Sequence, residues 1–156
     1  MDYVNKFISD IQARNAKEEV ITTGKSVCEL KKSTAEFDIS ITATFQIVNS
    51  KLTSLTYLTV TNGDAKEDKN KLEKLYTECI NLRDEVSVLD GVTISCSSNN
   101  GVVNNKQIIN YEKIDKTKVT SAYTEAGGVY PEFKKGQNID EIESKMTSSG
   151  YKCSRE

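Results

Sequence analysis

Residues 37–61 read FDISITATFQIVNSKLTSLTYLTVT, and their pattern predicts a β-hairpin. From Phe37 to Ile47 apolar and polar residues alternate, which is the period of a strand with one buried face. Asn49-Ser50-Lys51 supplies turn residues, and the second arm, 52–61, is rich in β-branched and aromatic side chains. The two arms should therefore pair antiparallel and bury one common face.

A long amphipathic helix is expected after this hairpin. Asn62-Gly63 ends the strand, and Asp64 with Glu67 resembles a capping box, so the helix should begin near Ala65. Its apolar residues share one stripe, and they are Leu72, Leu75, Tyr76, Cys79, Leu82 and Val86. We expect this stripe to pack on the sheet.

A second hairpin is predicted beyond the helix. Asp90-Gly91 breaks the helix, after which Val92, Ile94 and Cys96 alternate with polar residues. Asn99-Asn100-Gly101 favours a hairpin turn because its residues tolerate positive φ. Residues 102–111 should then return antiparallel.

The two ends of the chain add shorter elements. Residues 2–19 carry apolar side chains at helical spacing, so we expect a helix that either packs on the core or forms a stalk from a membrane anchor. Asn138 with Glu141 should start a last helix that ends at Gly150, and 151–154 should form a short strand.

These patterns together predict an α+β fold. An antiparallel sheet of four to five strands, made from two hairpins, packs against one long helix, with a short C-terminal helix and an N-terminal helix. Residues 1–22 are expected to form the N-terminal helix or stalk, and 23–156 a single domain.

The segment 112–137 is predicted to be irregular. Gly127-Gly128 and Pro131 act as breakers, and Tyr123, Tyr130 and Phe133 are isolated aromatic residues. These rings either pin the loop to the core or form a contact surface for a ligand or partner.

The composition excludes several function classes. The chain has 156 residues with 21 Lys and Arg against 23 Asp and Glu, a net charge of -2, so we expect no nucleic-acid partner. It has no histidine, which excludes histidine-dependent catalysis and histidine-ligated zinc. No calcium loop, nucleotide-binding glycine loop or local cluster of metal ligands is present, so no cofactor or metal is expected.

The expected compartment depends on the chain start and the cysteines. No apolar run reaches the roughly 18 to 20 residues that span a bilayer, and residues 1–6 lack a signal-peptide pattern. We therefore expect either a cytosolic protein or a mature fragment with an added Met. Any membrane contact would then come from an anchor absent from this chain.

Four cysteines at dispersed positions favour two disulfides over reduced core thiols. Cys79 lies on the core stripe of the long helix and Cys96 on the inward face of the next strand, so this pair should close across the helix–sheet layer. Cys28 and Cys153 lie in the first and last extended segments, where a bond would fasten the terminal strand. We predict the pairs Cys28–Cys153 and Cys79–Cys96.

The order of elements resembles the YehR-like lipoprotein family of bacterial cell-envelope proteins. The resembling stretches are 37–60, the helix 69–86, the strand opening at Gly91-Val92-Thr93-Ile94, the strand Ile109-Asn110-Tyr111, and the ending 139–153 with Ser148-Ser149-Gly150-Tyr151-Lys152-Cys153. The resemblance implies an α+β fold, an extracytoplasmic location and no catalytic residues to carry over.

One feature departs from that family. Its members are typically anchored by a lipid on an N-terminal cysteine that follows a signal peptide. Cys28 follows a polar segment rather than an apolar one, so it is a poor candidate for lipidation. The resemblance then implies that an anchor upstream was removed or replaced by a membrane helix.

The first functional hypothesis is a membrane-anchored, extracytoplasmic binding or structural module of a bacterial cell envelope. Its partner would be an unknown protein or small ligand, and 112–137 would be a contact surface. The alternative is a carrier of a small ligand or peptide, with a pocket between helix and sheet that Tyr57, Tyr76, Tyr111 and Tyr123 could line, although these residues also suit ordinary core packing.

A third hypothesis is a hydrolase built on two acids. The candidates are Asp38, Asp90, Asp115 and Asp140, each of which equally suits a cap, a turn or a surface charge. We expect the chain not to be an enzyme, because it offers neither histidine nor a nucleophile with a recognisable base.

Overall fold

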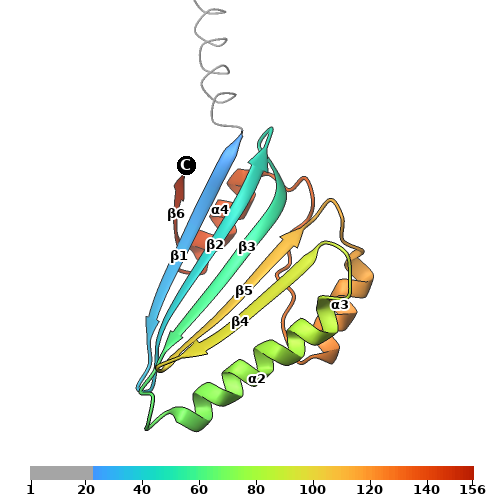
Figure 1. Cartoon of the computed structure of the whole chain (residues 1–156). Coiled ribbons are helices and arrows are strands. Elements are labelled where there is room, and N and C mark those ends of the chain that lie inside the picture. Colours follow the sequence, from blue (N-terminus) through green and yellow to red (C-terminus); the bar gives the residue numbers. More distant parts are fainter. Residues whose placement is uncertain (1–22) are drawn as a thin grey trace, which may run out of the picture.

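The chain forms one antiparallel sheet whose inner face is covered by helices (Figure 1). The computed structural model describes residues 23–156, so the N-terminal helix or stalk expected at 1–22 lies outside the described residues. The strands are β1 (Gly24–Ser33), β2 (Asp38–Val48), β3 (Lys51–Asn62), β4 (Val92–Asn99), β5 (Val102–Asn110) and β6 (Lys152–Arg155), and the helices are α2 (Lys69–Val86), α3 (Lys116–Glu125) and α4 (Ile139–Ser148). The strand order is β4-β5-β3-β2-β1-β6.

The first predicted hairpin is confirmed. Strand β2 pairs antiparallel with β3 from Asp38–Asn62 to Val48–Lys51. Asn49 and Ser50 turn the chain with φ of 52° and 63°, a region that asparagine tolerates better than most residues. The second hairpin, β4 with β5, turns through Asn100 and Gly101, which also have positive φ.

The sheet has six strands rather than the predicted four to five. Strand β1 joins as a full member along β2, and β6 adds a further strand against residues 26–29 of β1. Strand β6 confirms the short strand predicted at 151–154, and it lies beside the opening strand, as the predicted Cys28–Cys153 bond requires. Its place depends on tertiary contacts, since Cys28 and Cys153 lie directly opposite each other in the register.

The prediction of one long helix with an irregular 112–137 is also wrong, because α3 lies inside that segment. The Asp115 side chain caps α3 by accepting a hydrogen bond from the Lys118 amide at 3.2 Å. Val119, Ala122 and Tyr123 then bury one face of the helix. Threonine-rich residues give α3 little intrinsic helix propensity, so tertiary burial rather than local preference forms it.

Helix α2 begins at Lys69, later than the predicted Ala65. The Asp64 carboxylate does accept bonds from the amides of Lys66 and Glu67, at 2.8 and 2.9 Å, but within a turn. The Asp64 amide in turn donates to the Asp68 carboxylate at 2.8 Å, and not to Glu67 as a capping box would require. These bonds close the turn 64–68, and α2 then begins after Asp68, whose side chain does not cap the helix.

A single core joins the inner face of the sheet to the helices. It includes Cys28, Phe45 and Leu55 of the sheet, Cys79 of α2 and Ile142 of α4, all at most 2% exposed. Helix α2 runs along the β4 side of the sheet and α4 lies near β1 and β6 (Figure 1). Between α2 and the central strands β3 and β5, the inner face of the sheet carries polar rather than apolar side chains.

Candidate functional site

Polar side chains interrupt the apolar inner face of the sheet beneath α2. They are Thr59 and Thr61 of β3 and Asn105 and Gln107 of β5. Farther along the same face, Leu55 and Ile109 pair with each other and are fully buried. Strand alternation would place apolar residues at all of these inward positions, so the polar ones mark a local exception to core packing.

These side chains line a groove between α2 and the sheet, which we call the α2 groove. Its volume is about 360 Å³, at the lower end of the range of small-molecule sites. Helix α2 contributes Leu75, Glu78, Cys79 and Leu82, strand β5 adds Val103, and residues 126–129 after α3 complete the lining. The α2 groove thus combines aliphatic walls with a polar floor.

A hydrogen-bonded chain fixes the orientation of the floor amides. The Tyr123 hydroxyl donates to Gln107 Oε1 at 2.7 Å, and Gln107 Nε2 donates to Asn105 Oδ1 at 3.3 Å. Burial, and then the neighbouring Tyr130, raise the pKa of Tyr123, so its hydroxyl stays protonated as a donor. Asn105 therefore has its acceptor occupied, while its Nδ2 donor has no protein partner among residues 23–156.

The hydroxyls of Thr59 and Thr61 are also uncommitted. Neither makes a side-chain hydrogen bond to the part of the chain that the structure describes, although Thr61 is only 6% exposed. Neither hydroxyl is among the buried side-chain atoms that lack a partner within 23–156, so each can take its hydrogen-bond partner from the groove. Access to the groove lets water or a ligand supply that partner.

Among residues 23–156, Glu78 is the only charged residue that lines the groove, and no Lys or Arg lines it. It is exposed on α2, and it forms no ion pair with another described residue. The α2 groove is therefore locally negative, which disfavours phosphate and other anions.

The four tyrosines predicted to line a pocket do not line this one. Tyr111 and Tyr123 are buried, and Tyr76 is half-buried on α2. The Tyr57 hydroxyl lies 3.2 Å from that of Tyr151, in a tyrosine pair near β6. Tyr123 supports the floor from behind, through Gln107. The pocket lies between helix and sheet as the carrier hypothesis requires, but with different residues.

The predicted contact surface of Tyr123, Tyr130 and Phe133 is absent, because all three are at most 7% exposed. Tyr123 and Tyr130 pack edge to face with ring centroids 5.5 Å apart, and Phe133 packs on Phe45 at 5.0 Å. The rings therefore pin 126–137 to the core, which is the first of the two alternatives that the sequence left open.

The four candidate aspartates are all exposed, and each has a structural role or place of its own. Asp38 accepts a bond from Ser33, and Asp115 caps α3. Asp140 pairs with Arg155, and Asp90 lies in the turn before β4. Within residues 23–156 there is also no group of three acidic or cysteine side chains placed to hold a metal ion.

The disulfides join Cys28 to Cys153 and Cys79 to Cys96, the pairs that the sequence pattern predicts. Cys79–Cys96 ties α2 to β4 and so holds one side of the α2 groove. Neither bond leaves a free cysteine. The disulfides therefore stabilise the frame of the groove and the terminal strand.

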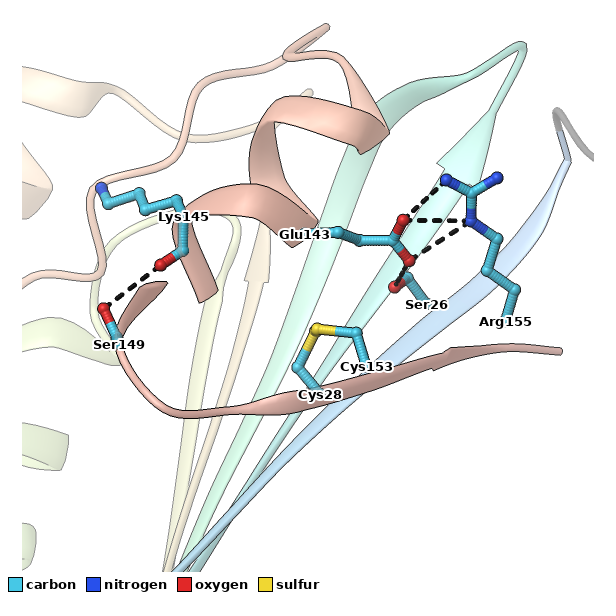
Figure 2. Close-up of a disulfide and its surroundings, with 7 residues drawn as sticks. All are labelled: Ser26, Cys28, Glu143, Lys145, Ser149, Cys153 and Arg155. Atoms are coloured by element: carbon cyan, nitrogen blue, oxygen red, sulfur yellow. Dashed lines mark hydrogen bonds and ion pairs between the residues drawn. A yellow bond between two sulfur atoms is a disulfide. The ribbon is translucent and has the colours of Figure 1, made fainter. Parts of the chain in front are cut away.

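Figure 2 shows the ion cluster beside Cys28–Cys153. Glu143 of α4 accepts a 2.6 Å bond from Ser26 of β1 and further bonds from Arg155 of β6, the shortest also 2.6 Å. Burial would raise the pKa of Glu143, but the bonds from Arg155 and Ser26 outweigh it and hold that pKa below its usual range. This cluster links α4 to β1 and β6, and none of its residues lines the α2 groove.

Sequence reasoning missed the floor of the α2 groove, although a signal was present. The inward positions of β5 read Val103, Asn105, Gln107 and Ile109, so two amides stand in an otherwise apolar series.

No helix among residues 23–156 is long and apolar enough to cross a membrane.

No family model and no curated protein matches the chain. A protein from Streptococcus pneumoniae TIGR4, solved by NMR, is similar with 12% identity and a TM-score of 0.56, over 85% of this chain and 86% of that one. The E. coli YehR protein, also solved by NMR, has 17% identity and a TM-score of 0.47, over 84% of this chain and 91% of that one. The pneumococcal match shows the fold alone, and the YehR match is too distant to carry an argument.

Proposed function

We propose that this protein is an extracytoplasmic binding module that holds a small polar ligand in the α2 groove. The observation that carries the proposal is the polar floor. Thr61 and Asn105 occupy inward sheet positions, yet they present unpartnered polar atoms to a groove of about 360 Å³. Positions that break the rules of core packing are commonly functional, because they cost stability.

An oxidising compartment fits the two disulfides, since such bonds persist mainly in secreted and cell-surface proteins. The proposal includes display at the outer side of a bacterial membrane through an anchor outside 23–156, as the resemblance to YehR-like lipoproteins implies. Non-reducing peptide mapping of protein from the producing cells tests the compartment. Both disulfide-linked peptides are expected, and four free thiols would contradict it.

Ligand binding is tested by NMR titration of the ¹⁵N-labelled full chain with a panel of small polar ligands. The panel contains dipeptides, monosaccharides, polyamines and nucleotides. We expect at least one class to shift the amide signals of residues 59, 61, 105 and 127–129 saturably. Thr61→Val should weaken that binding because it removes a floor hydroxyl.

Thr56→Val is the matched control, because Thr56 lies on the same strand and points to the opposite face of the sheet. It should leave the titration unchanged. The proposal is wrong if no class in the panel shifts the groove signals, or if both variants weaken binding equally.

A further inference from the structure

The floor of the α2 groove calls for a hydrogen-bond acceptor on the ligand. Asn105 Oδ1 is occupied by Gln107 Nε2, whose own Oε1 accepts from Tyr123. This chain of bonds leaves Asn105 Nδ2 as a donor with no partner in 23–156. A carbonyl oxygen on the ligand would satisfy it, while the hydroxyls of Thr59 and Thr61 can both donate and accept.

The side of the groove formed by α2 calls for a positive charge. Glu78 contributes a carboxylate, and among the described residues it has no ion-pair partner and no cationic side chain lines the groove. An ammonium group would find a charge-assisted partner there, whereas a carboxylate or phosphate would meet repulsion.

The lining also narrows the class of ligand in two other ways. Among residues 23–156 it contains no aromatic side chain, so this part of the chain offers no stacking platform for a nucleobase or a sugar ring. Leu75, Leu82, Val103 and Val129 provide aliphatic surface that suits a methylene chain. A carbonyl, a short aliphatic chain and an ammonium are the groups of a basic aminoacyl unit.

We propose that the α2 groove binds a lysine-like aminoacyl or short peptide unit, with its carbonyl on Asn105 and its ammonium at Glu78. This inference rests on the proposed function and specifies its ligand class. The Glu78 carboxylate selects a positively charged ligand, while the Asn105 donor on the floor selects a ligand with an amide carbonyl.

The test compares three probes by NMR titration of the full chain. N-acetyl-lysine methylamide carries both groups, N-acetyl-norleucine methylamide has the same four-carbon side chain without the ammonium, and pentylamine lacks the carbonyl. We expect the lysine probe to bind about two- to fivefold tighter than the norleucine probe, as for one partly exposed ion pair. Pentylamine should bind more weakly than the lysine probe, and 1 M salt should reduce the lysine preference.

Glu78→Gln should abolish the preference for lysine over norleucine. Glu73→Gln is the matched control, since it makes the same charge change on the same helix outside the groove lining, and it should retain the preference. Equal binding of both amide probes to the wild type would overturn the charge assignment but leave the groove as a binding site. Binding of a sugar or nucleotide to the groove, with neither amide probe bound, would overturn the ligand class.

Discussion

Tyr123 and Gln107 are joined by a buried 2.7 Å hydrogen bond that links α3 to β5 directly behind the α2 groove. Tyr123 is fully buried and Gln107 is 8% exposed. The bond orients the Gln107 amide so that its nitrogen faces Asn105. A core contact therefore determines which hydrogen-bonding groups the floor offers to a ligand.

Tyr123→Phe should destabilise the protein by about 1–3 kcal/mol, because it leaves Gln107 Oε1 buried without a donor. Urea unfolding of the oxidised protein measures this loss. Tyr130→Phe is the control, since the Tyr130 hydroxyl is buried with no partner among the described residues, and it should be neutral or stabilising. Equal losses in the two variants would contradict the role of the Tyr123–Gln107 bond.

Thr61→Val should stabilise the unliganded protein by about 0.5–1 kcal/mol, because it restores an apolar residue at an inward sheet position. The same variant should bind groove ligands more weakly. The urea midpoint of each variant measures stability, and an NMR titration of the same variant measures ligand binding, so the two effects are separated. Destabilisation by more than about 1 kcal/mol would mean that the hydroxyl has a structural role instead.

The sheet was largely predictable because alternation over long strands is a strong local signal. The run from Phe37 to Ile47 and the turn at Asn100 and Gly101 determine the two hairpins from neighbouring residues alone. Strand β6 was predicted from the short extended ending at 151–154, and the predicted Cys28–Cys153 bond placed it beside the opening strand. Helix α3 was not predicted, because it is short and depends on partners far along the chain.

The location of the candidate site was predicted only in outline. A pocket between helix and sheet was one alternative, and four tyrosines were candidates either for its lining or for ordinary core packing. The floor consists of Thr59, Thr61, Asn105 and Gln107 instead. Which face of β3 and β5 turns toward α2 is set by strand pairing across the sheet, and that information is not local.

The two disulfides should differ in their contribution to stability. In the chain-entropy account, the 125-residue separation of Cys28–Cys153 gives about 5 kcal/mol and the 17-residue separation of Cys79–Cys96 about 3 kcal/mol. Urea unfolding of the double alanine variants of each pair measures this. A larger loss from removing Cys79–Cys96 would show that its tie between α2 and β4 outweighs loop entropy.

The Glu143 cluster should make stability fall in acid. The pKa of Glu143 is lowered in the folded state, so its contribution is complete above the ordinary glutamate pKa of about 4.3 and is lost as the pH falls through the folded-state value. Glu143→Gln should cost about 1 kcal/mol at pH 7 and flatten the acid limb of the stability curve.

Glu141→Gln serves as the control for that experiment, because Glu141 is exposed on the same helix and forms no ion pair with another residue of 23–156. Its stability curve should keep the acid limb of the wild type. An unchanged acid limb in Glu143→Gln would contradict the assignment to this cluster.

Intermolecular nuclear Overhauser effects between bound N-acetyl-lysine methylamide and the protein test the central claim most directly. The probe is expected in the α2 groove, so its methylene protons should show contacts to the methyl groups of Leu75, Leu82 and Val103, which line it. Contacts confined to Val60 and Ile108, whose register positions place them on the opposite face of the sheet, would contradict the account.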